Sequence, residues 1–334
     1  MCTSLRLTTA DHGAVVARTM EFPDLMRAQI TVLPRGQELT GVAPDGTGHR
    51  WTSAHGVVGI DAFGRPDWLT DGTNEHGLYA GLLYMPGFCD YTPADGHAPD
   101  ELLAIVNVVA FVLGTCTSVE AAIAAMQTVT VWPLVVPAMG LAPPAHVVLH
   151  DAGGASAVIE WVGGAMVAFD NPIGVATNSP HLDWHLTNLR NYVALRPANP
   201  APFSVQGVEI APLGQGPGMT GLPADASGPS RFVRAAAYVS TLDPVADARA
   251  GELAALHVIN NFDLPRGFVR DGDGGAVEDA TLWTTIANLT DRRYIVRGID
   301  DPTPLAIDLA ATAFDGAAPR QVPIPTGTFA ALAI

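Results

Sequence analysis

The sequence has few cysteines, few basic side chains and no long apolar run, and each shortage excludes a class of protein. Its three cysteines, Cys2, Cys89 and Cys116, cannot all pair and show no C-x-x-C spacing. This argues against a disulfide framework and fits a reducing compartment, with Cys89 and Cys116 as structural thiols. The longest apolar stretch, residues 102–113, contains Asn107 and is shorter than the ~20 residues that a helix needs to cross a bilayer.

Basic side chains are outnumbered by acidic ones. The 334 residues include 17 Lys and Arg against 33 Asp and Glu, a net charge of −16, and no run of Lys or Arg occurs. Such a surface repels nucleic acid and anionic membranes, so polyanion binding is not expected. No basic segment followed by an apolar one opens the chain, so we expect no signal peptide and a cytoplasmic enzyme. A hydrophobic content of 48% is ample for a large core.

The first four residues, Met1-Cys2-Thr3-Ser4, contain the first candidate for catalysis. If Met1 is removed, as is usual before a small residue, Cys2 carries both a thiol and a free α-amino group. An α-amine titrates near pH ~8 and a thiol near ~8.5, so one residue supplies a nucleophile and its own general base. The alternative is that Cys2 is a small apolar residue at the start of a strand.

The chain begins with two alternating stretches around a turn, residues 2–8, 11–13 and 15–20. This pattern predicts a β-hairpin that brings Arg18 and Glu21 beside Cys2. A guanidinium near a thiol favours the thiolate, and Glu21 is suited to hold the α-ammonium or Arg18 in place. The alternative for Arg18 and Glu21 is an ordinary surface ion pair.

Alternation and turn residues predict further strands over residues 30–34, 77–85, 146–150, 155–161, 165–169, 281–288 and 294–298. The third to fifth of these are expected to form an antiparallel meander. Helices are predicted over residues 99–113, 117–127, 231–240 and 252–261, and from near Asp183. The second helix is expected to open with a capping box, Thr117-x-x-Glu120.

Three polar residues lie at the ends of these elements. Tyr84 ends a strand, where its backbone N–H is suited to bind an oxyanion, and Asn178 ends a strand that Pro180 breaks, where its amide is suited to the same task. The alternatives are packing for Tyr84 and a turn for Asn178. Arg231 lies in the first turn of a helix, against the helix dipole, which suggests a role in a site. The alternative is a solvated surface arginine at a helix start.

Three other sequence patterns are similar to a metal site, a dinucleotide site and an EF-hand but do not meet the requirements of these sites. His181 and His185 have a spacing that a metal could use, but they are not part of H-E-x-x-H, and we interpret them as structural. Residues 216–221 match G-x-G-x-x-G without a preceding strand or a following helix, so a dinucleotide site is not expected. Residues 271–275 do not continue as an EF-hand and are interpreted as an acidic turn.

Five short segments form a characteristic series, of which the fourth and fifth, in this order and spacing after Cys2, are highly specific. They are M-C-T-S at 1–4, A-R-T-M-E-F at 17–22, D-G-T-N-E-H-G-L at 71–78, T-N-S-P with W-H-L-T-N-L-R-N-Y at 177–180 and 184–192, and G-L-P with S-R-F-V-R at 221–223 and 230–234. Together they resemble the choloylglycine hydrolase and penicillin V acylase family of N-terminal nucleophile hydrolases. The resemblance extends from Cys2 almost to the C-terminus.

The resemblance implies an α+β fold, a four-layer αββα sandwich with two antiparallel sheets flanked by helices. It implies a single domain over residues 2–334 after loss of Met1, often assembled as a homotetramer, that hydrolyses a small-molecule linear amide. By position, Cys2 attacks the carbonyl, Arg18 tunes the thiol and Glu21 binds near the amine. The amide of Asn178 and the backbone of Tyr84 form the oxyanion hole, and Arg231 completes the polar cluster. No metal or organic cofactor is called for.

Two departures from the family bear on the substrate. Glu21 stands where the family usually has Asp, and one methylene extends the carboxylate by roughly 1.5 Å, which is enough to disturb a catalytic geometry. A catalytically impaired homologue that binds an acyl or amide ligand is therefore the alternative of a different class. Tyr84 stands where penicillin V acylases have Tyr, while bile-salt hydrolases carry Asn in that strand. This favours a penicillin V acylase-like amidase over a bile salt hydrolase or an N-acyl homoserine lactone acylase, with loops 88–99 and 133–144 shaping the pocket.

Overall fold

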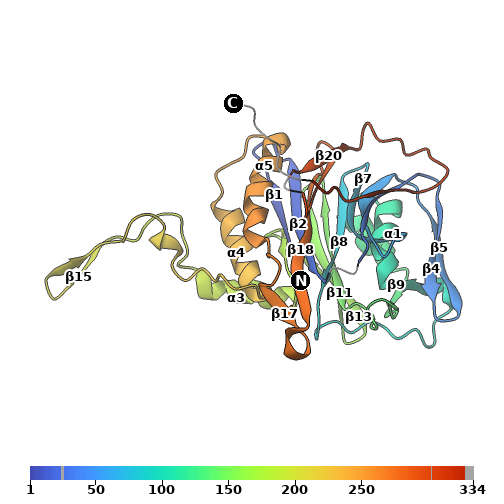
Figure 1. Cartoon of the computed structure of the whole chain (residues 1–334), viewed down its shortest axis with the longest axis horizontal. Coiled ribbons are helices and arrows are strands. Elements are labelled where there is room, and N and C mark those ends of the chain that lie inside the picture. The colour runs from blue at the N-terminus through green and yellow to red at the C-terminus, as the bar shows by residue number, and fades with distance from the viewer. Residues whose placement is uncertain (24–25, 302, 328–334) are drawn as a thin grey trace.

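Two antiparallel sheets pack face to face, and helices cover the outer side of each, as Figure 1 shows. The computed structural model describes residues 1–23, 26–301 and 303–327. The fold is the four-layer αββα sandwich of the α+β class that the sequence predicts. No helix in these ranges has the length and apolar character needed to span a membrane.

The first sheet contains both N-terminal strands of the chain. Its strands run in the order β14 (Val175–Ala176), β1 (Cys2–Thr8), β2 (Ala14–Phe22), β18 (Val277–Asn288), β19 (Arg293–Gly298) and β20 (Leu305–Asp308), with β17 (Val269–Asp271) paired to β18. Its outer face is covered by α3 (Leu182–Asn188), α4 (Gly228–Thr241) and α5 (Ala248–Ile259).

The second sheet has eight strands. Their order is β13 (Ala165–Asp170), β12 (Ser156–Val162), β11 (Ala145–Asp151), β8 (Leu78–Tyr84), β7 (Arg65–Asn74), β6 (Val57–Ala62), β3 (Gln29–Leu33) and β21 (Arg320–Pro323). Helices α1 (Val108–Thr115) and α2 (Val119–Met126) pack on its outer face. The two-stranded sheets are β4 (Glu38–Ala43) with β5 (Gly46–Thr52), β9 (Leu102–Ala104) with β10 (Thr130–Trp132), and β15 (Phe203–Val205) with β16 (Val208–Ile210).

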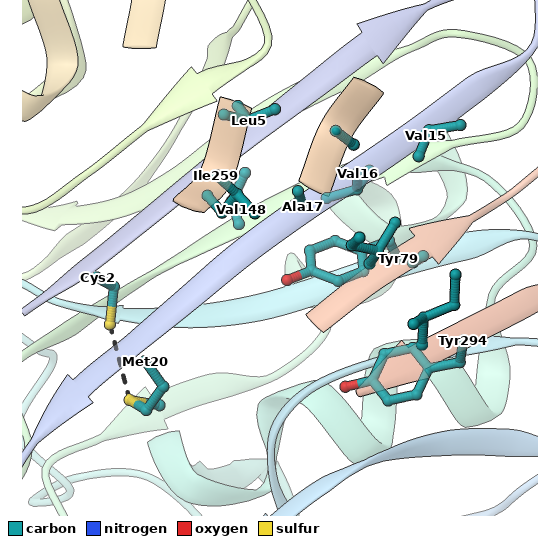
Figure 2. Close-up of a cluster of buried hydrophobic side chains, with 14 of the residues drawn as sticks. Cys2, Leu5, Val15, Val16, Ala17, Met20, Tyr79, Val148, Ile259 and Tyr294 are labelled. Atoms are coloured by element: carbon teal, nitrogen blue, oxygen red, sulfur yellow. Dashed lines mark hydrogen bonds between the residues drawn. The ribbon is translucent and has the colours of Figure 1, made fainter. Parts of the chain in front are cut away.

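The hydrophobic core consists of two clusters of buried side chains, and each contains residues from distant parts of the chain. One cluster joins the first sheet to α5 and to the second sheet, and Figure 2 shows Leu5 of β1, Val148 of β11 and Ile259 of α5 within it. The other cluster lies between the second sheet and the helices α1 and α2. Fully burying each large apolar side chain contributes about 1.5–3 kcal/mol, which is what holds the four layers together.

Strand β1 begins at Cys2, and its pairing with β2 confirms the predicted hairpin. Cys2 lies opposite Met20 and Ser4 lies opposite Arg18. The pairing continues to Met1, whose carbonyl accepts a hydrogen bond from the Glu21 N–H at 2.9 Å and whose ammonium donates to the Glu21 carbonyl. Arg18 and Glu21 are therefore brought beside Cys2, as the hairpin predicts.

The predicted helix over residues 99–113 is wrong for its first half. Residues 99–107 form two 3₁₀ turns and the strand β9, which pairs in parallel with β10, and α1 begins only at Val108. A continuous apolar run is compatible with a buried strand as well as with a buried helix, so periodicity could not separate the two. The predicted capping box at Thr117 is also wrong, because Ser118 caps α2 by accepting a hydrogen bond from the Ala121 N–H at 3.1 Å.

The other predicted helices and strands are confirmed with shifted ends, while β4 to β7, β10, β15 to β17, β20 and β21 had no counterpart in the prediction. Strand β7 contains Pro66, Asp67 and Gly72, which are depleted in strands. Gly72 is required by close packing, since a Cβ there would lie 2.6 Å from the Val58 carbonyl oxygen of β6. Tertiary packing therefore overrides the weak local preference of this segment.

The buried side chain of Asn74 holds the turn between β7 and β8. Its Nδ2 donates to the carbonyls of Leu113 at 2.9 Å and Cys116 at 2.7 Å, at the C-terminal end of α1. Its Oδ1 accepts from the N–H groups of His76 at 3.0 Å and Leu78 at 3.1 Å. One amide thus satisfies carbonyls that a helix end leaves unpaired and fixes the turn to the helix layer.

We expect Asn74→Ala to lower the free energy of unfolding by about 3 kcal/mol, because buried polar groups at both of its ends lose their partners. Urea denaturation measures the loss. The matched control is Asn191→Ala, whose amide makes one exposed hydrogen bond to Asn188 and which should change stability by less than about 0.5 kcal/mol. Equal stability of Asn74→Ala and the parent would contradict the role given to this side chain.

Candidate active site

Cys2 lies at the start of β1 with its side chain buried and pointing between the sheets. The thiol is 3.9 Å from the Met20 sulfur, as Figure 2 shows, and 3.6 Å from Nη2 of Arg18. The exposed fraction of Cys2 is 2%. A guanidinium at this distance stabilises a thiolate over a thiol, as the sequence predicts for Arg18 beside Cys2.

Arg18 is completely buried, so its alternative interpretation as part of a surface ion pair is wrong. Its Nη2 donates to the Leu82 carbonyl at 2.6 Å, and its Nη1 donates to the Thr70 carbonyl at 3.2 Å and lies 3.4 Å from Oδ2 of Asp71. Burial lowers the pKa of Arg18, but Asp71 and then the Cys2 thiolate raise this pKa by more, so the guanidinium stays charged.

Asp71 belongs to the site, although no role was predicted for it from the sequence. Its carboxylate accepts from the Tyr294 hydroxyl at 2.9 Å and from the Thr285 hydroxyl at 2.6 Å, both on the first sheet. Burial, and then Asp71, raise the pKa of Tyr294 well above its ordinary value, so this hydroxyl remains a donor. No local signal distinguishes Asp71, because β7 also contains the polar residues Asp67, Thr70, Thr73 and Asn74. Only its complete burial shows that its carboxylate requires a charged or hydrogen-bonding partner.

A second polar group lies on the other side of Cys2. Its backbone nitrogen donates to Oδ1 of Asn178 at 2.9 Å, and the same Oδ1 accepts from Nη2 of Arg231. Nη1 of Arg231 donates to the Cys2 carbonyl and to the Thr3 hydroxyl, the latter at 2.8 Å. The structure therefore brings Cys2, Arg18, Asn178 and Arg231 into one hydrogen-bonded cluster.

Arg231 is completely buried, so its alternative interpretation as a solvated surface residue is wrong. It lies in the first turn of α4, which Ser227 caps, and its Nε donates to the Ala226 carbonyl at 2.8 Å. Burial lowers the pKa of Arg231, while the negative charge of Glu21 raises it. The unfavourable position at a helix N-terminus is thus offset by contacts with the site and by a nearby carboxylate.

Glu21 is also completely buried, which excludes the surface ion pair considered for it. Its Oε1 accepts from the Thr281 hydroxyl at 2.9 Å, on the neighbouring strand β18. The carboxylate that pairs with Arg18 is Asp71 rather than Glu21. Burial raises the pKa of Glu21, and the charges of Arg231 and the N-terminal ammonium only partly counteract this effect.

Tyr84 contacts the cluster through its carbonyl group, which accepts a hydrogen bond from Nδ2 of Asn178. His185 supports Asn178 from behind, with its Nε2 2.9 Å from the Asn178 carbonyl and its ring stacked on Phe232. Burial lowers the pKa of His185 to about 4, so the neutral ring donates this hydrogen bond. His181 instead lies 2.6 Å from a carboxylate oxygen of Glu160, which agrees with structural roles for both histidines.

The thiol opens into an apolar pocket of about 80 Å³. Its walls come from β2, from the segment that joins β6 to β7, from β7 itself and from loop 133–144, and they include Met20, Phe22, Phe63, Trp68, Val136 and Met139. Loop 133–144 therefore shapes the pocket as expected. Arg18 and Asn178 do not line the pocket but contact Cys2 and Tyr84, which do, so an apolar acyl group fits the walls while its carbonyl reaches the thiol.

This arrangement is that of a cysteine N-terminal-nucleophile hydrolase, in which one residue at the start of a strand supplies the reacting groups. A family profile described as linear amide C–N hydrolases, choloylglycine hydrolase family, matches residues 2–321. The chain belongs to this family and is an enzyme that hydrolyses the carbon–nitrogen bond of linear amides.

The relatives include two kinds of amide hydrolase. The chain is 28% identical over 317 residues to a bile salt hydrolase/transferase of Clostridium perfringens, covering 95% of this chain and 94% of that protein. It is 26% identical over 328 residues to the penicillin V acylase of Pectobacterium atrosepticum, covering 92% and 79%. The crystal structure of the C2A mutant of a conjugated bile acid hydrolase from C. perfringens superposes with a TM-score of 0.87, at 26% identity and 100% coverage of both chains.

We expect Glu21→Gln to become more stabilising, relative to the parent, as pH rises. The folded pKa of Glu21 lies above its ordinary 4.5, so the folded chain holds this proton more tightly than the unfolded chain does. The contribution of Glu21 to stability is therefore present below pH 4.5 and lost as pH rises through the folded pKa.

Urea denaturation of both proteins over a series of pH values measures this difference. It should grow from pH 4.5 upward and level off once Glu21 is ionised in both states. Glu38→Gln, which removes a carboxylate at an exposed position of β4, is measured over the same pH series as the control. A pH-independent difference for Glu21→Gln would show that the folded protein does not perturb this carboxyl group.

Proposed function

We propose that this protein is a penicillin V acylase-like amidohydrolase that cleaves amides of small apolar acyl groups. The observation that carries the proposal is the position of the Cys2 thiol, which lies 3.6 Å from Arg18 and opens into an apolar pocket. The pocket volume of about 80 Å³ is small against the ~300–1,000 Å³ of typical ligand sites. A short aromatic or aliphatic acyl group suits such a pocket better than a steroid does.

The catalytic form is the chain without Met1, and residues 2–334 act as one catalytic domain. In support of this, strands from both ends of the chain share sheets, since β18 pairs with β2 and β21 pairs with β3. Removal of Met1 turns the Cys2 backbone nitrogen into an α-amine whose hydrogen-bond acceptor, Oδ1 of Asn178, is already present at 2.9 Å. An amine that donates to Oδ1 keeps its lone pair for the thiol proton.

In the first step the Cys2 sulfur attacks the substrate carbonyl carbon, and the thiol proton passes to the Cys2 amine. Arg18, held by Asp71, stabilises the thiolate that attacks. The tetrahedral intermediate collapses to a thioester as the amine delivers the proton to the leaving nitrogen. Water then hydrolyses the thioester, which releases the carboxylic acid and restores the thiol.

Asn178 is the proposed side-chain donor to the oxyanion, and the backbone N–H of Tyr84 is the proposed second donor. An amide NH₂ carries two hydrogens, and one of those on Nδ2 of Asn178 is bound by the Tyr84 carbonyl. The second hydrogen is left for the oxyanion. Arg231 holds Oδ1 of the same amide, which orients the donor and polarises its N–H groups. Glu21 acts on this cluster through its charge near Arg231 and the amine.

The substrate test separates the candidate acyl groups. Penicillin V, a glycine-conjugated bile acid and an N-acyl homoserine lactone are incubated with the enzyme, and the released amine is measured. We expect the highest kcat/KM for penicillin V. Preference for the bile acid or the lactone would favour those alternative activities, and turnover of none by protein whose N-terminus is Cys2 would favour a binding protein.

We expect Cys2→Ala to lower turnover by about 10⁴-fold or more without unfolding the protein, because the nucleophile is lost while the surrounding core remains. Amine release and circular dichroism measure the two effects. Cys89→Ala is the matched control, since its half-buried thiol contacts the Ala145 carbonyl rather than the cluster, and it should keep its activity. Unchanged turnover of Cys2→Ala would refute the mechanism.

We also propose a homotetramer in the cytoplasm. The hairpin of β15 and β16 projects from the body of the molecule in Figure 1 and exposes Phe203, Val205, Val208 and Ile210. An isolated two-stranded hairpin is at best marginally stable in water, so a second copy of the chain is the proposed partner that covers these side chains. All three cysteines are free, which supports a reducing compartment.

We expect Phe203→Ser combined with Val208→Ser to dissociate the tetramer, since both substitutions remove apolar surface from the projecting hairpin. Light scattering after size-exclusion chromatography measures the mass. Leu253→Ser, on α5, removes a side chain that is similarly exposed, at 60% against 61% for Phe203, and should leave the mass unchanged. A tetramer that survives the double substitution would place the interface elsewhere.

A further inference from the structure

Two histidines and a glutamate meet at the end of the second sheet that lies away from Cys2. One ligand atom from each of His55, Glu75 and His76 lies within 4.8 Å of the other two. The imidazole rings of the two histidines are edge to face, with centroids 4.6 Å apart. Strand β8 starts directly after this turn and ends at Tyr84, so the cluster is about 20 Å from the proposed oxyanion site.

We propose that His55, Glu75 and His76 bind a divalent transition-metal ion, with Zn²⁺ as the reference ion, at a structural site separate from amide hydrolysis. Two imidazoles and one carboxylate are ligands that zinc accepts at about 2.0–2.2 Å, with water in the fourth position. Ligand atoms around such an ion lie somewhat closer together than 4.8 Å, so small side-chain rotations close the site.

The segment that carries His55 is fixed by hydrogen bonds before any ion binds. The His55 N–H donates to the Gly114 carbonyl at 3.2 Å, and its carbonyl accepts from the Ser53 hydroxyl at 2.8 Å. Glu75 is tied to the same segment, because its N–H donates to the Gly56 carbonyl at 3.0 Å and its Oε1 accepts from the Gly56 N–H at 2.8 Å. Two of the three ligands therefore belong to one rigid unit.

The third ligand is held by the turn described above. The N–H of His76 donates to Oδ1 of Asn74, whose Nδ2 is anchored to the end of α1. The backbones of all three ligands are thus immobilised, and only side-chain torsions remain to be fixed on binding. Such preorganisation lowers the entropy cost of closing the site.

The ligand atoms are available. Within the part of the chain that the structure describes, neither imidazole nitrogen of His55 or His76 has a hydrogen bond.

Arg35 shares Glu75 with the proposed ion. A carboxylate offers about four lone-pair positions. Nε of Arg35 takes one on Oε1 at 2.7 Å, Nη2 of Arg35 takes one on Oε2, and the Gly56 N–H takes a third. One position remains for a metal ion. The charge of Arg35 is also matched by Asp315, whose Oδ1 lies 2.8 Å from Nη1 of Arg35.

Isothermal titration of the full chain with ZnCl₂ tests the proposal. The Cys2→Ala protein serves as the parent, so that the thiol contributes no binding. We expect one Zn²⁺ per chain and a rise in melting temperature with added Zn²⁺. Adding His55→Ala and His76→Ala together should weaken binding by more than the ~10–100-fold that loss of an outer-shell partner costs, and should abolish the rise.

The matched control is His257→Ala, which removes an exposed histidine from α5, outside the cluster, and should bind Zn²⁺ like the parent. His76→Gln, which keeps the size and polarity of the side chain, covers the case in which the double variant fails to fold, and it too should weaken binding. Absence of Zn²⁺ binding by the parent would overturn the proposal. Equal affinity of His76→Gln and the parent would overturn it as well.

Discussion

The buried ion pair of Arg18 and Asp71 joins the two sheets, and the rest of the site depends on it. Arg18 extends from the first sheet and Asp71 from the second, 3.4 Å apart and without solvent exposure. Such a pair persists only when hydrogen bonds satisfy most of the remaining polar atoms, and here Tyr294, Thr285 and the Leu82 carbonyl do so. Within the described residues, Nε of Arg18 is buried without a partner. The pair fixes the separation of the layers, and it also holds one guanidinium against the thiol.

The other half of the site is assembled from segments that are far apart in the chain. Asn178 lies 176 positions from Cys2, and Arg231 lies 229 positions from it. Both are held by helices on the outer face of the first sheet, Asn178 through His185 on α3 and Arg231 through its place on α4. The helix layer therefore positions the polar groups, while the space between the sheets supplies the apolar pocket.

The separation of the site residues along the chain explains how much of the site could be predicted from the sequence. Arg18 and Glu21 could be placed beside Cys2 by local reasoning, because a hairpin fixes its own register. Asn178 and Arg231 could be assigned only through a family resemblance, since no local pattern encodes a contact across most of the chain. Asp71 received no role because its partner lies on another sheet. Residues 99–107 were predicted as part of a helix because the apolar run within them, residues 102–106, lacks the periodicity that separates helix from strand.

The pairing of Met1 with Glu21 has a consequence for the order of maturation. While Met1 is attached, the nitrogen of Cys2 is part of a peptide bond, and its delocalised lone pair cannot accept a proton. Met1 is hydrogen-bonded to Glu21 in both directions at the end of β1, so loss of Met1 breaks both of these hydrogen bonds. Under the proposed mechanism, the Cys2 amine therefore becomes available only when this end of the first hairpin gives up its last pairing.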